Sequence, residues 1–267
     1  MAALSEKLVL FVVKAISMKK RADQLVVEQG LCESRTLAQR LIQAGKVRIG
    51  DDQVVSKPGQ LLAEETVLQV LEPCPYVSRG AYKLLAALDQ FNPPLTGMIA
   101  LDVGASTGGF TDLLLQRGVM RVFAIDVGYG QLHLKLRQDP RVINIERTNA
   151  RHLSREQVPE PVDLLVSDVS FISLTKVLPA CAPLVKPGGW VFVLVKPQFE
   201  ARREEIGKNG VVRDETVRQR CVEEVSSFAE REFGWRRLGV VESPIKGPKG
   251  NQEYIAAFRI PEPGSST

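Results

Sequence analysis

The amino-acid sequence predicts an α/β protein in which a small α+β domain precedes a doubly wound, mostly parallel sheet that ends in an antiparallel hairpin. Three observations lead to this prediction. Apolar strand-like runs alternate with helix-like runs from residue 99 onward, as in a parallel α/β sheet. A glycine-rich turn follows the first of these runs, and a proline-rich stretch separates this region from a compact, cation-rich unit before it.

The composition is that of a globular chain with a mildly basic balance. Its 267 residues include 35 lysines and arginines against 31 acids, for a net charge of +4. This length suits one large domain and a small one, and the charge permits a polyanionic partner without requiring one. The four cysteines form no Cys-x-x-Cys pair and the two histidines form no ligand-spaced cluster, so we expect reduced thiols, a cytoplasmic protein and no metal.

The first seventeen residues do not fit either domain. The apolar run at residues 8–13 is bracketed by Lys7 and Lys14 and is far too short to span a bilayer. No clear cleavage site for a secretory signal follows it. We therefore expect residues 1–17 to be an extension, with Met18 beginning the working protein, and we expect no stable membrane insertion.

Residues 18–72 are predicted to form the small domain. Helix-like spacing covers residues 21–28, and Ser34 is placed to cap a second helix at residues 35–44. Short strands are expected at residues 46–49, 53–55 and 66–70.

Positive charge gathers in this domain. Between Lys19 and Arg48 there are seven lysines and arginines and only three acids. Such a surface suits RNA phosphates, although charge alone does not distinguish it from a solvated helical face. The candidate RNA-binding residues, including one at the start of the next domain, are Arg21, Arg35, Arg40, Lys46, Arg48 and Arg79.

The order of residues in this unit is more specific than its charge. The segment Arg21-Ala-Asp-Gln-Leu, the run Ser34-Arg-Thr-Leu-Ala-Gln-Arg-Leu-Ile-Gln-Ala-Gly-Lys-Val-Arg-Ile-Gly50 and Val55-Ser-Lys-Pro58 resemble the alpha-L RNA-binding domain of a ribosomal small-subunit protein. The resemblance covers nearly the whole unit and implies that it binds structured RNA.

Residues 73–77 are predicted to be a linker, and residues 78–260 the large domain. A helix is expected to begin at Ser78. The expected strands that follow lie at 99–103, 122–126, 142–145, 162–168, 190–196, 237–242 and 253–259. The expected helices lie at 109–117, 132–137, 174–184 and 214–233, and residues 261–267 are predicted to be a disordered tail.

The turn after the first strand predicts a cofactor site. Gly104 follows an acid, and the run lacks both the Gly-x-Gly-x-x-Gly of a dinucleotide fold and the Gly-Lys-Ser/Thr of a phosphate loop. Asp102 would repel a pyrophosphate but suits the positive groups of S-adenosylmethionine. Asp126 ends the second strand, where it can hold a ribose. A nicotinamide cofactor, and a turn without any cofactor, remain alternatives. The expected cofactor-binding residues are Asp102, Gly104, Ser106, Thr107, Gly108, Gly109, Phe110, Asp126 and Asn149.

Charged residues at the strand ends are the candidates for catalysis. Asp168 ends the fourth strand and Lys196 the fifth, at the edge where ligands of such sheets bind. A lysine after a fully apolar strand is costly to place without a partner or a task. Lys83 precedes the sheet and Glu253 begins the last strand, and we expect the four side chains to face one pocket.

These residues carry a second resemblance. Lys83, Asp168, Lys196 and Glu253 match the Lys-Asp-Lys-Glu tetrad of FtsJ-like ribose 2′-O-methyltransferases, and the alternating strands resemble the Rossmann-like class I methyltransferase architecture. With the alpha-L domain in front, the chain from about Lys19 to Ile260 resembles the TlyA-type family, whose members are named both as haemolysins and as ribosomal RNA methyltransferases. The resemblance implies transfer of a methyl group from S-adenosylmethionine to a ribose 2′-hydroxyl of ribosomal RNA, with cytidine as the target nucleoside and ribosomal RNA or ribosomal subunits as partners.

The role of Lys196 is left open by the sequence. A ribose hydroxyl is a poor nucleophile until it loses its proton, so Lys196 either removes that proton or orients the oxygen. A base must be neutral, whereas Asp168 and Glu253 would stabilise a protonated lysine. The charged segment between Phe199 and Val211 is either an RNA-contacting lid or a solvated loop.

Two other functions compete with the methyltransferase. One is a membrane-active haemolysin, which the sequence disfavours because it contains neither a spanning run nor a long basic amphipathic helix. The other is an RNA-binding or ribosome-assembly factor with an inactive methyltransferase domain, which the complete tetrad and glycine turn disfavour.

Overall fold

The structure is a computed structural model that describes residues 18–50, 53–70 and 74–264. The predicted extension at residues 1–17, part of the turn at 51–52, the boundary residues 71–73 and residues 265–267 of the predicted tail lie outside the described residues. The chain forms two compact units that divide between Pro75 and Tyr76.

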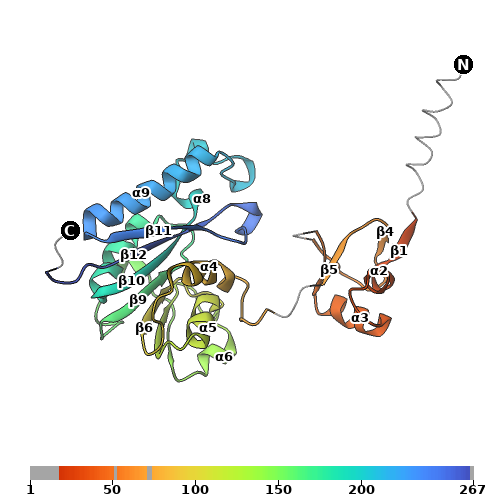
Figure 1. The fold of residues 1–267 in the computed structure, drawn as a ribbon, viewed down its shortest axis with the longest axis horizontal. Coiled ribbons are helices and arrows are strands. Elements are labelled where there is room, and N and C mark those ends of the chain that lie inside the picture. Colours follow the sequence, from red (N-terminus) through yellow and green to blue (C-terminus); the bar gives the residue numbers. More distant parts are fainter. Residues whose placement is uncertain (1–17, 51–52, 71–73, 265–267) are drawn as a thin grey trace, which may run out of the picture. The chain divides into compact units, whose positions relative to one another are not determined.

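The N-terminal unit packs two helices against short strands. Helix α2 is Ala22–Glu28 and helix α3 is Arg35–Gln43, and the Ser34 hydroxyl caps α3 by accepting from the backbone N–H of Leu37. Apolar side chains of both helices belong to this unit's own core, and Figure 1 shows the two helices beside the short strands. Its strands are β1 (Lys19–Arg21) paired with β4 (Leu61–Ala63), and a sheet of β3 (Gln53–Val54), β2 (Val47–Ile49) and β5 (Leu68–Val70).

Two of these strands were not predicted. The sequence pattern predicts that Arg21 begins a helix, but Arg21 is the last residue of strand β1. The pattern also predicts no strand at residues 19–21 or at residues 61–63. The two pair antiparallel, with Lys20 opposite Leu62. Strands this short carry no periodicity, because their structure depends on a partner distant in the sequence.

The C-terminal unit confirms the predicted mostly parallel sheet with its terminal hairpin. Its strands lie side by side in the order β11-β12-β10-β9-β6-β7-β8 (Figure 1). Strands β6 to β10 run parallel, and β12 is antiparallel to both of its neighbours. The strands are β6 (Ile99–Val103), β7 (Arg121–Ile125), β8 (Val142–Ile145), β9 (Val162–Ser167), β10 (Val185–Val195), β11 (Arg236–Glu242) and β12 (Tyr254–Arg259).

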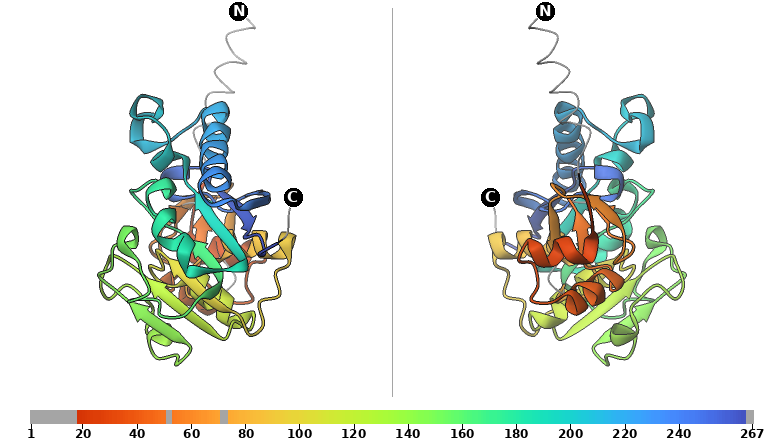
Figure 2. Two further views of the ribbon diagram at one scale, coloured as in Figure 1. Left: turned by 90° about the vertical axis from the view of Figure 1, so that its left-hand side faces the viewer. Right: turned by 90° about the vertical axis from the view of Figure 1, so that its right-hand side faces the viewer.

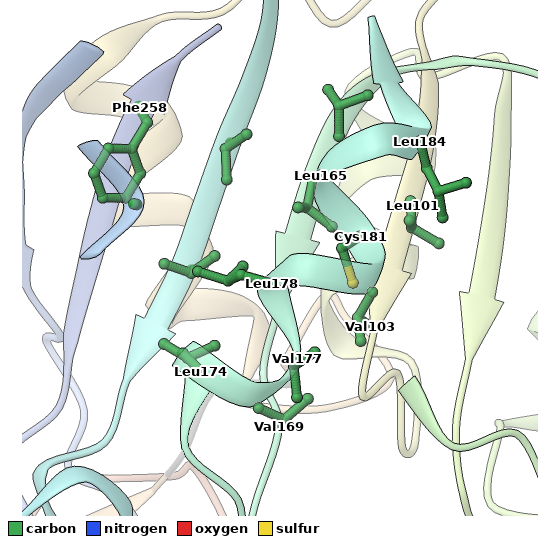
Figure 3. Close-up of a cluster of buried hydrophobic side chains, with 14 of the residues drawn as sticks. Leu101, Val103, Leu165, Val169, Leu174, Val177, Leu178, Cys181, Leu184 and Phe258 are labelled. Carbon is green, nitrogen blue, oxygen red and sulfur yellow. The ribbon is translucent and has the colours of Figure 1, made fainter. Parts of the chain in front are cut away.

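Helices cover both faces of the sheet because alternate strand residues point to opposite sides. Ala100 packs with α4 (Ala81–Phe91) and α5 (Gly109–Gln116), whereas Leu101 packs with α7 (Leu178–Cys181). Helix α9 (Glu215–Phe233) also packs on the second face, which Figure 2 shows from two sides. Figure 3 shows Leu178 and Cys181 of α7 among side chains of the sheet.

The region from 174 to 195 differs from the prediction in two ways. The single helix expected at 174–184 is broken into a 3₁₀ turn at Leu174–Lys176, then α7, then a 3₁₀ turn at Ala182–Leu184. Pro179 and Pro183 cannot donate a backbone hydrogen bond, which prevents one continuous helix. Strand β10 begins at Val185 rather than Trp190, with a register shift against β9 between these two residues.

Over the part of the chain that the structure describes, helices are too short or too polar to cross a membrane.

Candidate active site

The strand order reverses between β6 and β9, and the glycine-rich turn lies at this point. Ligands of open α/β sheets bind at such a reversal, outside the carboxyl ends of the strands. Gly104 follows β6 with a φ of +86°, and its N–H donates to the Ile125 carbonyl at 2.9 Å. A Cβ on Gly104 would lie 2.6 Å from the Asp168 carbonyl oxygen, so only glycine lets the two strand ends come this close.

Two adjoining cavities open at these strand ends. One has a volume of about 460 Å³ and reaches toward the ends of β7 and β8, with Asp126, Gln131 and Asn149 in its wall. The other, of about 340 Å³, extends toward α4 and contains Lys83, Asp102 and Lys196. We call them the cofactor cavity and the tetrad cavity. The residues lining both are Gly104, Ser106, Asp168 and Ser170.

Asp102 is the most unusual group in the tetrad cavity. Its side chain is 0% exposed, and one carboxylate oxygen accepts from the Thr111 hydroxyl at 2.6 Å. The other oxygen, Oδ1, is buried without a hydrogen-bond partner in the described structure. Burial raises the pKa of Asp102 to about 7, and the nearby Asp168 and Asp126 charges act in the same direction. A positively charged donor at Oδ1 would satisfy this carboxylate.

Asp126 and Asn149, two of the predicted cofactor-binding residues, both lie in the wall of the cofactor cavity. Asp126 follows β7 and accepts from the backbone N–H groups of Ser106 at 2.8 Å and Gly128 at 2.7 Å. Asn149 precedes a 3₁₀ turn and caps it by accepting from the Arg151 N–H at 3.1 Å. These bonds fix both side chains in the cavity wall before any ligand arrives.

The remaining residues of the turn divide between ligand and packing positions. Gly109 and Phe110, at the start of α5, line the tetrad cavity together with Thr107. Gly108 is not among the residues lining either cavity. A Cβ there would lie 2.2 Å from Leu136, so Gly108 keeps α5 close to the residues of α6 (Leu134–Arg137).

Lys83 and Glu253 form a buried ion pair. Lys83 is on α4, Glu253 precedes β12 and is 0% exposed, and the ammonium donates to the Glu253 carboxylate at 2.6 Å. Lys83 also lies 3.8 Å from Asp168. A Cβ on Gly247 would lie 2.1 Å from the Glu253 carboxylate, so the loop before β12 closes tightly over this pair.

Lys196 completes a row of alternating charges. Its ammonium lies 2.5 Å from the Asp168 carboxylate and donates to the Ser170 hydroxyl at 2.8 Å. The row therefore runs Glu253, Lys83, Asp168, Lys196, with no net charge. An ammonium has three N–H donors, so two go to Asp168 and Ser170 and one can meet a substrate oxygen.

Several residues around this row were not singled out from the sequence. Ser170 lies two residues beyond Asp168, and that spacing is the signal that could have found it. Phe171 is 90% exposed with a φ of +63°, and its ring centroid lies 5.1 Å from that of Phe199. The Phe199 ring in turn lies 5.8 Å from the Lys196 ammonium.

Glu200 ties these segments together. It ends α8 (Pro197–Glu200), which directly follows Lys196. Its carboxylate accepts from the Ser173 hydroxyl at 2.6 Å and from the Leu174 N–H at 2.8 Å. Burial raises the pKa of Glu200. The loop that carries Ser170 and Phe171 is thereby fastened to the segment that carries Lys196.

In the N-terminal unit, two predicted RNA-binding arginines surround one buried acid. Asp23 is 0% exposed, and Arg21 donates to both of its oxygens, at 3.0 and 2.9 Å. Arg35 lies 3.3 Å from the same carboxylate, and Gln39 donates to it at 2.8 Å. The hydrogen bonds from Arg21 hold the pKa of Asp23 well below its ordinary value. Two guanidinium groups are thus held at the surface by one carboxylate.

The other candidate RNA-binding residues lie on different elements. Arg40 is exposed on α3, Lys46 precedes β2, and Arg48 is within β2. Arg79 is exposed in the C-terminal unit, between Ser78 and Gly80 of the tetrad cavity. No group of three or more His, Cys, Asp or Glu side chains suited to a metal ion occurs in residues 18–50, 53–70 and 74–264.

Comparison with known proteins shows which families the two units match. Residues 76–260 match the model of the FtsJ-like methyltransferase family, and residues 20–68 match that of the S4 domain. The chain is 47% identical over 246 residues to a Mycobacterium tuberculosis protein named 16S/23S rRNA (cytidine-2′-O)-methyltransferase TlyA, covering 91% of each chain. It is 40% identical over 241 residues to Hemolysin A of Brachyspira hyodysenteriae, covering 90% of this chain and 100% of the relative.

A solved structure agrees with the fold across both units. It comes from Streptococcus thermophilus, carries a haemolysin name and is 42% identical to this chain. The match covers 94% of this chain and 93% of that one, with a TM-score of 0.71.

Proposed function

We propose a function from the family of this chain, which belongs to the TlyA-type family of FtsJ-like methyltransferases with an N-terminal S4 domain. The protein methylates the ribose 2′-hydroxyl of a cytidine in ribosomal RNA, using S-adenosylmethionine. The observation that carries this proposal is the row Glu253, Lys83, Asp168 and Lys196 in the cavity that adjoins the cofactor cavity. Such a row can hold and activate a neutral hydroxyl without needing a net charge of its own.

The chain's own residues fit S-adenosylmethionine, which supplies a methyl group on a positive sulfonium when bound. The unpartnered Oδ1 of Asp102 suits an ammonium, and Gly104, which lines both cavities, lets the ends of β6 and β9 come close together beside it. Asp126 accepts the ribose hydroxyls, and Asn149 contacts the adenine at the far end of the cofactor cavity. The turn around the methionine end is completed by Ser106, Thr107, Gly109 and Phe110. Gly108 keeps α5 packed closely against α6 beside this turn.

Lys196 orients the substrate oxygen in this mechanism. Asp168 and Ser170 take two of the N–H donors of the Lys196 ammonium, so its remaining N–H donates to the ribose 2′-oxygen and stabilises the negative charge that develops there as the hydroxyl proton passes to water. Lys83 neutralises Asp168 from the opposite side and is itself held by Glu253. The sequence leaves two roles open for Lys196, and this mechanism gives it the orienting role rather than that of the base.

Two aromatic rings are placed to hold the target nucleotide. Phe171 is almost fully exposed and packs against Phe199, close to Lys196. Exposed aromatic rings stack on unpaired bases, and an enzyme that acts on a structured RNA must expose its target nucleotide. Stacking on Phe171 would hold the base while its ribose reaches Lys196.

The N-terminal unit supplies the affinity for structured RNA in this proposal. Arg21, Arg35, Arg40, Lys46 and Arg48 contact phosphates there, and Arg79 does so beside the tetrad cavity. We propose that the RNA-binding domain spans residues 18–72 and the methyltransferase domain 78–260, joined by a linker at 73–77. Working on ribosomal RNA or ribosomal subunits, the enzyme would act in the cytoplasm.

The test is transfer of tritium from labelled S-adenosylmethionine to separated ribosomal subunits and to free ribosomal RNA. The wild-type chain should label at least one of these RNAs, and Lys196→Ala should reduce the rate by about 100- to 1,000-fold while still binding cofactor. An absence of labelling by a wild-type protein that binds cofactor would refute the proposal. Lysis of erythrocytes, equal in wild type and Lys196→Ala, would instead favour the haemolysin activity that the family's other name implies.

A further inference from the structure

A second concave surface of the C-terminal unit lies outside both cavities of the active site. It has a volume of about 640 Å³ and is lined by the end of one loop, the start of α9 and the loop before β12. Three of its lining residues are cations, namely Arg213, Arg218 and Lys249. We call it the basic groove.

One buried side chain, that of Asn251, joins the two loops that line the basic groove. Asn251 is 2% exposed, donates to the Gly210 carbonyl at 2.9 Å and accepts from the Val212 N–H at 3.1 Å. It thereby joins the loop at 207–212 to the loop at 247–251. The groove is therefore held open by an internal hydrogen-bonded frame.

The pairing of its cations distinguishes this groove from neighbouring surfaces. Arg220, on the same helix as Arg218, pairs with Glu205 and Glu224, and Arg237 pairs with Glu223 and Glu230. In contrast, no carboxylate within 4.0 Å is found for the groove's three cations among the residues that the structure describes. Cations without carboxylate partners remain available to an anionic ligand.

The beginning of α9 carries one of the groove's cations, Arg218, and two acids. Arg218 donates to the Arg213 carbonyl at 3.1 Å, and its Nε is buried without a hydrogen-bond partner in the described structure. Asp214 and Glu215 are the acids closest in sequence. Asp214 is engaged in capping α9 through the Thr216 N–H, and Glu215 occupies the first turn, where the helix dipole already favours an anion.

The groove and the tetrad cavity share one loop. Gly247 lines the tetrad cavity, next to Glu253, whereas Lys249 lines the basic groove. Two residues of chain span at most about 7 Å, so the two surfaces adjoin. An RNA strand that places a ribose in the tetrad cavity can therefore lay a neighbouring phosphate in the groove.

We propose that the basic groove binds a phosphodiester of the same RNA strand that presents the target ribose. This inference rests on the proposed function. It adds a docking site in the C-terminal unit, so that the strand is held both at the active site and beside it. The contact positions the strand and carries no sequence information.

The test compares RNA binding by three full-length proteins over a range of salt concentrations. The variant Arg213→Gln/Lys249→Gln removes two groove cations, and Arg231→Gln removes a cation from the exposed far end of α9 as a matched control. For the double variant we expect a Kd for ribosomal RNA about tenfold higher, and a salt slope smaller by about 0.7–0.9 for each lost contact. Cofactor binding and Tm should match wild type, and Arg231→Gln should behave as wild type throughout.

The outcomes separate this inference from the proposed function. An unchanged Kd and salt slope in a folded double variant would contradict the proposed phosphate contact in the groove, even if the wild-type protein methylates RNA. A reduced slope in the double variant, together with a wild type that binds RNA but transfers no methyl group, would support the groove and refute the proposed reaction. If both hold, KM for RNA should rise in the double variant with kcat unchanged, because the contact is equally strong before and during reaction.

Discussion

Asp23 in the N-terminal unit and Asp102 in the C-terminal unit are both 0% exposed, and the two carboxylates have opposite surroundings. Asp23 in the N-terminal unit is met by Arg21, Arg35 and Gln39, and these partners lower its pKa. Asp102 in the C-terminal unit receives one hydrogen bond from the Thr111 hydroxyl, and burial raises its pKa to about 7.

This difference separates a structural charge from a ligand-binding one. A buried charge is costly unless its hydrogen bonds are satisfied. Asp23 is satisfied by the protein itself, so its role is to hold two arginines in place. Asp102 is left half satisfied at the wall of a cavity, so the missing partner is expected to come from a ligand.

The substitution Asp102→Asn should give the largest effect. The asparagine side chain keeps the size of the aspartate but carries no charge and cannot form an ion pair with an ammonium, and losing one partner of a buried charge pair costs about 2–5 kcal/mol. We expect affinity for S-adenosylmethionine to fall by about 100-fold, with the free energy of unfolding of the cofactor-free protein unchanged or increased. Equilibrium dialysis and thermal unfolding measure the two quantities.

The matched control for this variant is Asp163→Asn. Asp163 lies in β9 and pairs with Lys186. It should lose no cofactor affinity. Equal cofactor affinity in Asp102→Asn and wild type would remove the distinction drawn between the two buried acids.

Asp23→Asn should instead affect stability and RNA binding. Breaking a buried pair is strongly destabilising, but both arginines are about half exposed and screened, so we expect a loss of about 1–3 kcal/mol in the free energy of unfolding. RNA affinity should fall because Arg21 and Arg35 lose their fixed orientation. Cofactor affinity should not change, and a drop in it comparable to that of Asp102→Asn would contradict the account.

The pH dependence of the two acids should also differ. The pKa of Asp102 is raised from 3.8 to about 7, so the unfolded chain releases this proton first, and the wild-type cofactor-free protein loses stability from about pH 4 to pH 7. The stability advantage of Asp102→Asn should therefore grow over this range and level off above about pH 7. The Asp23 contribution is present above its ordinary pKa and is lost only in acid, so the stability loss in Asp23→Asn should stay constant from about pH 5 to 8. Denaturant unfolding at several pH values measures both differences.

Glu200→Ala should give the smallest effect. Without its bonds to Ser173 and Leu174, the loop that carries Ser170 is less firmly held against Lys196. We expect kcat to fall about fivefold with KM for cofactor unchanged, a split that general destabilisation would not produce. Glu204→Ala, at an exposed position nearby, is the control. A rise in KM for cofactor without a change in kcat would contradict this positioning role.

Much of the fold followed from the sequence because strong local patterns determine it. Strand-like and helix-like runs alternate from β6 to β10, which predicts a buried parallel sheet. The glycine turn at Gly104 predicts the edge of this sheet where a ligand binds. Asp168 and Lys196 could be found because they end strands that meet at one edge of the sheet, whereas Lys83 and Glu253 were identified through the resemblance to the FtsJ-like tetrad. Those residues do meet in one row, although their catalytic roles remain a proposal.

Other features depend on contacts that no local pattern encodes. The pairing of β1 with β4 requires residues far apart in sequence, and the broken helix at 174–184 reflects two prolines within one apolar run. The burial of Asp23 beneath Arg21 and Arg35 could not be read from charge spacing. The exposure of Phe171 and the frame around Asn251 likewise appear only once the loops are placed.

The central claim is that the methyl group reaches a ribose 2′-oxygen held by Lys196. It is tested most directly by alkaline hydrolysis of ribosomal RNA labelled with tritiated S-adenosylmethionine. Alkali cleaves RNA only beside a free 2′-hydroxyl, so we predict that the tritium is recovered in alkali-resistant dinucleotides that begin with cytidine, and that Lys196→Ala gives none. Tritium recovered in mononucleotides would place the methyl group on a base and contradict the account.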